Sequence, residues 1–171
     1  GMTLVWQDEF AGSALNATTW THETGTGSGG WGNNELQYYQ SQNTTVEDGY
    51  LTIEAREETV NNSNYTSSRI ITKDKRSANF GRIDIRAKLP KGKGVWPALW
   101  MLGDNISAVG WPKCGEIDIM ELVGGTTGDN TVHGTIHYEN GGHIYTGGYY
   151  SLGEGIFNDK FHVFSIVWNS T

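Results

Sequence analysis

Three acidic residues lie close together in one otherwise apolar segment, at Glu116, Asp118 and Glu121. The apolar residues between them predict a β-strand, in which the first two acids point to one face and Glu121 to the other. One extra residue, a β-bulge near Ile119 or Met120, would bring all three acids onto the same face. Crowded carboxylates cannot all ionise easily, so the pKa of at least one is expected to rise.

Such a group of carboxyls suits retaining glycoside hydrolysis. One ionised carboxylate attacks the anomeric carbon, while a protonated carboxyl roughly 5–5.5 Å away donates its proton to the leaving oxygen. Residues an effective four positions apart on a strand have Cα atoms about 13 Å apart, so the side chains must lean inward, helped by sheet curvature. The alternative is a solvent-exposed strand face with alternating acids and no catalytic role.

Strand patterns recur at short intervals along the chain, which favours an all-β sandwich or barrel. The clearest runs from Arg82 to Leu89, where apolar and charged residues alternate as in a half-buried antiparallel strand. Helix signals are weak, and residues 34–40 are expected to form loop and strand. The other expected strands are Leu4–Phe10, Tyr50–Glu57, Ser67–Thr72, Trp96–Leu102, Glu116–Val123, Thr131–Tyr138, Ile144–Tyr150 and Phe161–Trp168.

Length, composition and net charge exclude several classes of protein. The 171 residues suggest one domain, and 36% hydrophobic with 12% aromatic residues excludes a disordered chain. A net charge of -7 argues against a nucleic-acid partner. No apolar run approaches the roughly 18 residues of a membrane span. We therefore expect no nucleic-acid or membrane partner. We also expect a monomer.

The segment Glu116–Glu121, Glu-Ile-Asp-Ile-Met-Glu, resembles the signature of glycoside hydrolase family 16. It has the bulged form typical of laminarinase-like members, and also of agarases and carrageenases. Flanking blocks agree with the family in order, and the resemblance extends from Leu4 to Trp168. These blocks are Trp31–Tyr39, Ser68–Ile70, Gly81–Pro90, Gly94–Leu102 and His133–His137.

The resemblance implies a β-jelly-roll sandwich of two curved antiparallel sheets with a concave substrate cleft. It also implies that Glu116 is the nucleophile, that Asp118 assists it, and that Glu121 is the general acid/base. The implied activity is endo-hydrolysis of a β-1,3-glucan polysaccharide such as laminarin, with retention and without a cofactor. The alternatives are a hydrolase of mixed-linkage β-glucan or marine galactan, and a non-catalytic β-glucan-binding module. We expect a secreted or cell-surface protein.

Aromatic residues and histidines near the acids are candidates for sugar binding. Trp96, Trp100 and Trp111 could stack on sugar rings; core packing is the alternative for the first two, and a buried loop anchor for the third. His137 could hydrogen-bond the sugar or Glu121, as the resemblance implies. His133, on the same strand face, is expected to be a structural histidine.

Polar residues elsewhere in the chain complete the predicted site. Asn33, Glu35 and Arg69 could bond sugar hydroxyls; capping turns or pairing on the surface is the alternative. The resemblance implies a structural calcium ion on the convex face, held by Glu9 and Gly49 largely through backbone oxygens. An ordinary strand terminus is the alternative for both of these residues.

The domain organisation follows from the resemblance as well. We expect residues 1–171 to form a single catalytic β-sandwich domain. Family members carry further strands after the equivalent of Trp168. The chain is therefore expected to lack its C-terminal strands.

Overall fold

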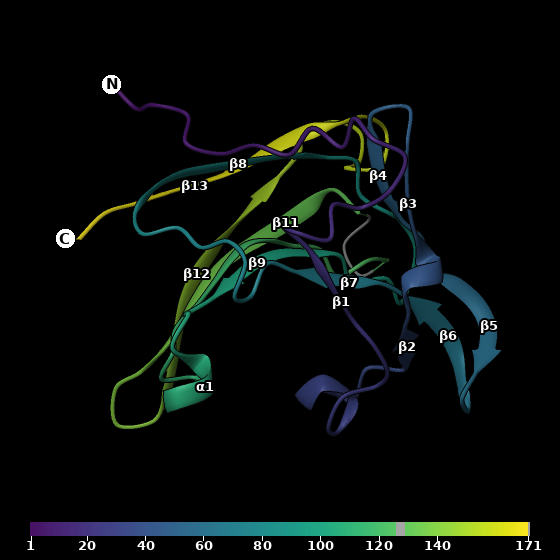
Figure 1. The fold of residues 1–171 in the computed structure, drawn as a ribbon, viewed down its shortest axis with the longest axis horizontal. Helices are drawn as coiled ribbons and strands as arrows, with labels where there is room; N and C mark the ends of the chain where they lie inside the picture. Colours follow the sequence, from purple (N-terminus) through teal and green to yellow (C-terminus); the bar gives the residue numbers. More distant parts are fainter. Residues whose placement is uncertain (126–128, 171) are drawn as a thin grey trace. The chain divides into compact units, whose positions relative to one another are not determined.

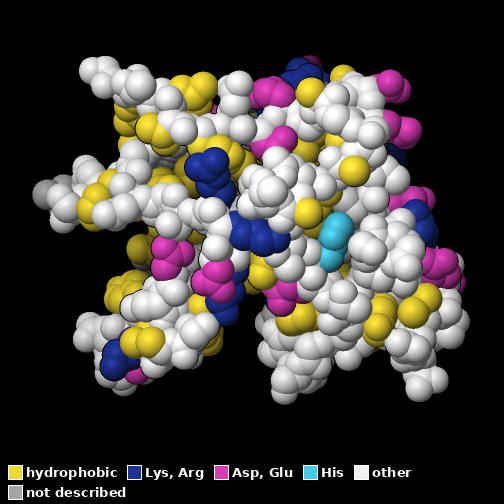
Figure 2. Space-filling model, in the orientation of Figure 1, with side chains coloured by type: hydrophobic (Ala, Val, Ile, Leu, Met, Phe, Trp, Pro, Cys, Tyr) yellow, Lys and Arg dark blue, Asp and Glu magenta, His cyan; other side chains and the backbone are white. Residues whose placement is uncertain are grey.

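The computed structural model describes residues 1–125 and 129–170. The chain is mostly β, with few helices among the described residues (Figure 1). It divides into two compact units, Gly1–Ser77 and Ala78–Thr171. Among the described residues, no helix is long and apolar enough to cross a membrane. On the face shown in Figure 2, Lys and Arg side chains are interspersed with Asp and Glu side chains.

Unit 1 is built from short strands. They are β1 (Thr21–Glu23), β2 (Gln37–Tyr39), β3 (Thr44–Glu47), β4 (Tyr50–Ile53), β5 (Arg56–Val60), β6 (Ser63–Ser67) and β7 (Arg69–Ile71), with turns η1 (Gly30–Asn34) and η2 (Ser41–Asn43). β1 pairs with β7 and β3 with β4, both antiparallel. β6 pairs antiparallel with β5 but parallel with β2, which corrects the expectation of purely antiparallel sheets. A parallel pair is possible here because a long connection separates β2 from β6.

Two strand predictions in unit 1 are wrong. Leu4–Phe10 forms no strand, since no described strand pairs with it and Phe10 takes a φ of 52°. The predicted strand Tyr50–Glu57 is divided, because the chain changes partner from β3 to β6 between Ile53 and Arg56. Alternating residues predict extended backbone, but an extended segment becomes a strand only beside a partner.

Unit 2 contains two sheets. Its elements are β8 (Gly81–Ala87), β9 (Ala98–Leu102), α1 (Ile106–Val109), β10 (Glu116–Glu121), β11 (Thr131–Glu139), β12 (His143–Ser151) and β13 (His162–Trp168). One sheet is four-stranded and antiparallel, in the order β12-β11-β10-β9, and the other is the antiparallel pair β13-β8. The alternation predicted for Arg82–Leu89 is confirmed in β8, where the apolar residues are less exposed than the charged ones.

A hydrophobic core joins the two sheets of unit 2. Met120 of β10, Val132 of β11 and Phe164 of β13 are buried in one cluster. Leu89 and Phe157, which follow β8 and precede β13, belong to it as well. Each fully buried side chain of this size stabilises the fold by roughly 1.5–3 kcal/mol. One face of β10 is thus buried in the core, and the acids lie on its other face.

Candidate active site

The three acids of β10 share one face because the strand carries one extra residue. From Asp118 to Glu121, three steps along β10 match two steps along β11, from Thr135 to His133. The register against β9 shifts at the same place. The predicted β-bulge is therefore present, and Met120 within it turns into the core, where it is 1% exposed.

Each glutamate accepts a hydrogen bond from an indole N–H. Trp111 Nε1 donates to Glu116 Oε2 at 2.7 Å, and Trp96 Nε1 donates to Glu121 Oε1 at 3.0 Å. Both indoles are 48% exposed, which excludes core packing for Trp96 and a buried anchor for Trp111. These contacts orient the two carboxyls, a role that the sequence analysis did not predict. Sugar stacking on either ring stays a prediction.

Trp100 also lies on the acid face. It stands directly opposite Asp118 in the ladder between β9 and β10, and directly opposed residues point to the same side of a sheet. Its side chain is half-buried. The structure thus places Trp100 beside the acids, as the sequence analysis expected.

Asp118 is bonded to a histidine pair. Its Oδ2 lies 3.0 Å from His137 Nε2, and His137 Nδ1 lies 2.8 Å from His143 Nε2. The two imidazoles are stacked, with centroids 5.1 Å apart. The expected hydrogen bond from His137 to Glu121 is therefore corrected to one with Asp118. The reason is the register, which places His133, not His137, opposite Glu121.

The pKa values on this face are raised by crowding and burial. Burial, then a hydrogen bond with Glu116 and the negative charges of Glu116 and Glu121, raise the pKa of Asp118 to about 8. Burial also raises the pKa of Glu121, and the charge of Glu116 adds to this, while the hydrogen bond from Trp96 acts in the opposite direction. Asp118 therefore retains its proton near neutral pH, and the protonated form of Glu121 is favoured.

The protonation of Asp118 orders the hydrogen bonds around it. A protonated Asp118 has one proton to donate, to Glu116, so its Oδ2 accepts from the Nε2–H of His137. With its proton on Nε2, His137 can accept at Nδ1 from the Nε2–H of His143. In this arrangement the hydrogen bond with His143 favours the tautomer of His137 that donates to Asp118.

The same residues include a group that could hold a cation. Glu116, Asp118 and His137 each offer a ligand atom, all within 4.8 Å of one another. Oxygen and imidazole ligands suit several divalent metals. The hydrogen bond between Asp118 and His137 already engages two of the three residues. A cation would have to displace it.

His143 is a residue that the sequence analysis missed. It starts β12, one position before the predicted strand, and lies opposite Glu139 at the end of the β11–β12 hairpin. Glu139 is two positions after His137 on β11, so His143 shares the face of His137. The register of the β11–β12 hairpin, had it been known from the sequence, would have placed His143 on the same face as His137.

The polar residues predicted to bind sugar belong to unit 1, and two of them are bonded to each other. Glu35 accepts hydrogen bonds from Asn33 Nδ2 at 2.8 Å, from Gln37 Nε2 at 2.8 Å and from the Tyr39 hydroxyl at 3.1 Å. Burial, and then the charge of Glu35, raise the pKa of Tyr39. Pairing with one another, the alternative for these residues, is thus observed, and sugar binding stays a prediction.

Arg69 lies over an aromatic ring in the same unit. Its guanidinium carbon is 3.8 Å from the Trp31 ring centroid, and its NH2 group pairs with Glu23 at 3.0 Å. Gly27 makes room for this ring, because a Cβ there would lie 2.5 Å from it and the residue takes a φ of 59°. The Trp31–Tyr39 block therefore presents an ordered polar and aromatic cluster.

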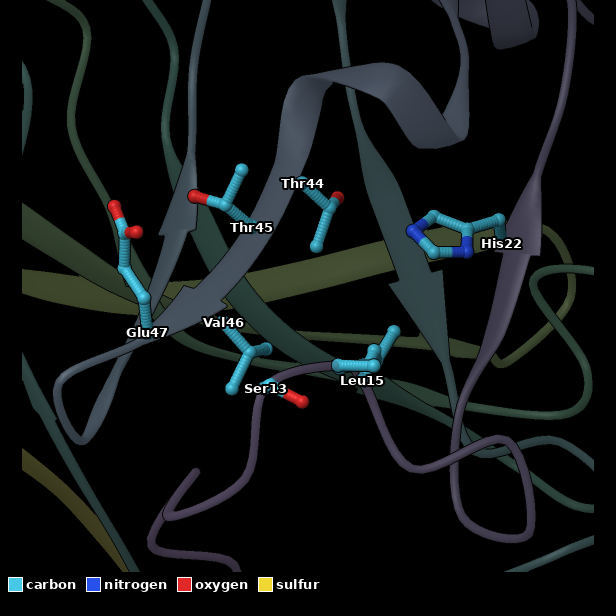
Figure 3. A pocket seen from close by; sticks show the side chains of 8 residues that line it. Ser13, Leu15, His22, Thr44, Thr45, Val46 and Glu47 are labelled. Atoms are coloured by element: carbon cyan, nitrogen blue, oxygen red, sulfur yellow. The ribbon is translucent and has the colours of Figure 1, made fainter.

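Unit 1 also contains a cavity of about 460 Å³ without any of the predicted sugar-binding residues. The ring of His22 points into it, and Thr44 and Val46 of β3 line it (Figure 3). Burial lowers the pKa of His22, whose Nε2 has no hydrogen-bond partner.

The proposed calcium residues are also in this unit. Glu9 is exposed in the segment without a strand, and Gly49 forms the turn before β4 with a φ of 79°, so the calcium site stays a prediction.

Comparison with known proteins identifies relatives of the whole chain. The sequence model of glycosyl hydrolases family 16 matches residues 31–171. Glucan endo-1,3-beta-glucosidase A1 of Niallia circulans is 44% identical over 188 residues, which cover 98% of this chain and 27% of that protein. The beta-glucanase of Rhodothermus marinus is 44% identical over 174 residues, which cover 96% of this chain and 59% of that protein. The chain thus spans only part of the length of these relatives.

A solved structure agrees in both fold and sequence. The catalytic domain of an endo-1,3-beta-glucanase (laminarinase) from Thermotoga petrophila RKU-1 superimposes with a TM-score of 0.90 and 48% identity. The match covers 98% of this chain and 70% of that domain.

Proposed function

This chain belongs to glycosyl hydrolases family 16, and from that membership we propose that it carries the catalytic residues of a retaining endo-β-1,3-glucanase acting on laminarin-like glucan. The relatives named above are glucanases, which supports the substrate class. The observation that carries the proposal is the β-bulge of β10, which gathers Glu116, Asp118 and Glu121 on one face. We also propose the finer architecture of the family, a β-jelly-roll with a concave cleft.

In the proposed first step, Glu116 attacks the anomeric carbon as Glu121 donates its proton to the leaving oxygen. The Trp111 N–H orients the attacking carboxylate, and burial raises the pKa of Glu121, which favours the protonated form that this step needs. In the second step Glu121, now ionised, removes a proton from water, which attacks the anomeric carbon and releases Glu116. No cofactor takes part in either step.

Asp118 supports both glutamates in this scheme. Its proton is shared with Glu116, so it stabilises the carboxylate that will attack. In its neutral form it adds no further negative charge near Glu121. Asp118 therefore supports the nucleophile by its hydrogen bond and leaves the proton of Glu121 available for the leaving oxygen.

Product analysis tests the proposal. We expect reducing ends to be released from laminarin faster than from lichenan or agar, with the β-anomer formed first in an NMR time course. Faster cleavage of lichenan would instead identify a hydrolase of mixed-linkage β-glucan, and faster cleavage of agar a hydrolase of galactan. Binding of laminarin without release of reducing ends would make it a glucan-binding module, and an α-anomer as first product would rule out the two-step mechanism.

The pH dependence offers a second test. Glu121 acts as an acid, so activity is present below its pKa and is lost as the pH rises through it. The hydrogen bond from Trp96 lowers that pKa, so Trp96→Phe should raise it and move the alkaline limb of kcat/KM to higher pH. Trp111→Phe is the matched control, because its indole bonds Glu116 instead. An equal displacement of the alkaline limb in both variants would contradict the assignment of Glu121.

His143 should affect the rate although it touches neither glutamate. His143→Ala removes the donor to His137 Nδ1, so we expect kcat on laminarin to fall about 2–10-fold, the value of one hydrogen bond. His143→Gln retains an N–H donor and should recover part of the loss. Equal kcat values for the two variants and the parent protein across the pH range would show that His143 does not position His137.

A further inference from the structure

Strand β12 carries two exposed tyrosines on the face of the sheet that holds the acids. Two rows of directly opposed residues cross the sheet, namely Glu116–His137–Tyr145 and Glu121–His133–Tyr149. Directly opposed residues in an antiparallel sheet point to the same side. Tyr145 and Tyr149 therefore extend the acid face by two strands beyond β10.

Neighbouring histidines flank both rings without covering them. The ring centroid of Tyr145 lies 5.9 Å from that of His137 and 5.7 Å from that of His143, and the ring of Tyr149 lies 6.3 Å from that of His133. Even so, Tyr145 is 68% exposed and Tyr149 is 76% exposed. His133, expected to be structural, is itself exposed on this face. Exposed aromatic side chains grouped on one face commonly mark a binding surface.

The residue of β12 between the two tyrosines on this face is a glycine, which has no side chain. Gly147 lies midway between them and opposite Thr135, in the row that contains Asp118. A Cβ at Gly147 would lie 2.2 Å from the carbonyl oxygen of Gly134, so the strands require glycine here. The Cα atoms of the tyrosines, four positions apart on a strand, are separated by about 13 Å. The gap leaves room for a sugar ring between two aromatic walls.

The position of this gap suits a polymer that crosses the strands. The row through Asp118 begins at Trp100 on β9 and ends at Gly147 on β12. Strands lie about 4.8 Å apart, so β12 is about 10 Å from the acids, on the side away from Trp100. A linear glucan lying along this row would pass the acids and then reach the two tyrosines.

We propose that Tyr145 and Tyr149 form a remote subsite that holds a sugar unit of the glucan beyond the units at the scissile bond. The inference rests on the proposed glucanase function. Phenol rings offer an apolar surface to the C–H face of a pyranose and a hydroxyl to its rim. Contacts this far from the reacting bond supply binding energy that orients the chain at the acids.

The subsite predicts a dependence on chain length. In the double variant Tyr145→Ala/Tyr149→Ala, the ratio of kcat/KM for laminarihexaose to that for laminaritriose should fall about tenfold, equivalent to about 1.4 kcal/mol. Tyr145→Leu/Tyr149→Leu, which keeps apolar bulk but no aromatic ring, should lower the ratio in the same direction. Tyr150→Ala is the matched control, because Tyr150 is 65% exposed but lies opposite Val132, on the other face of β12. An unchanged ratio in both double variants, or an equal fall in the control, overturns the subsite.

A binding measurement separates this inference from the proposed function. Calorimetry with laminarihexaose on a Glu116→Gln background requires no hydrolysis. Weaker binding when both tyrosines are replaced supports the subsite even if the parent protein proves inactive. If the protein hydrolyses laminarin but replacing the tyrosines leaves the affinity unchanged, the glucanase proposal stands and the subsite is refuted.

Discussion

Replacing Glu116 by Gln is expected to lower kcat on laminarin by about 10⁴-fold or more, the scale of a lost nucleophile, while the affinity for the glucan stays nearly unchanged. The amide cannot attack the anomeric carbon. Its oxygen can still accept the hydrogen bond from Trp111 Nε1, so the side chain keeps its orientation. Reducing-end release and calorimetry with laminarin measure the two quantities. Full activity in this variant would refute the assignment of the nucleophile.

Two controls make this result specific. Glu154→Gln removes an acid from an exposed loop of the same unit and should retain the parent kcat. Glu116→Ala assayed with azide and an activated aryl glucoside should recover turnover and yield an α-glycosyl azide, because azide attacks from the face that the carboxylate has vacated. A β-glycosyl azide would instead indicate that Glu116 is the acid/base.

Replacing Glu121 by Ala is expected to slow laminarin hydrolysis by about 10²–10⁴-fold, the usual contribution of general acid catalysis. Formation of the glycosyl-enzyme from a dinitrophenyl glucoside should be slowed far less, because that leaving group departs without a proton. Burst kinetics on the aryl substrate and steady-state rates on laminarin measure the difference. Equal losses on both substrates would contradict the role of Glu121 as proton donor.

The pH profile of this variant gives an independent check. If Glu121 is the proton donor, its raised pKa sets the alkaline limb of the pH profile, so Glu121→Ala should lose that limb. Azide should restore turnover with a β-glycosyl azide as product. An alkaline limb that persists unchanged would assign it to another group.

Together the two glutamate variants distinguish an enzyme from a binding module. A glucan-binding protein would bind laminarin equally well with or without either carboxyl. It would also gain nothing from a buried, protonated acid beside an ionised one. The raised pKa values of Asp118 and Glu121 therefore favour catalysis, and the substitutions test it directly.

Most of unit 2 could be predicted from local patterns. The alternation in Arg82–Leu89 predicted β8, and the spacing of acids in Glu116–Glu121 predicted a bulged strand. Side chains alternate in any strand, so an odd spacing between Asp118 and Glu121 demands one extra residue if both are to share a face. This inference needs no knowledge of the partner strands.

Predictions that depended on a partner strand were less accurate. Leu4–Phe10 has a strand pattern but no described partner, and Tyr50–Ile53 pairs with a different strand from the residues that follow. The expected partner of His137 was the sugar or Glu121, whereas pairing of β10 with β11 places His137 beside Asp118. In each case the error lies in which segments pair.

Residue types and their local spacing thus predicted the group of acids on β10 and the need for a bulge, and the sequence motifs predicted the family. Only the tertiary structure decided that indole N–H groups bond the two glutamates, that His143 lies within hydrogen-bond distance of His137, and that two tyrosines extend the acid face. The physical reason is that side-chain direction along a strand repeats every two residues and can be read locally. The neighbours across a sheet depend on the pairing and register of segments far apart in the chain, which no local pattern specifies.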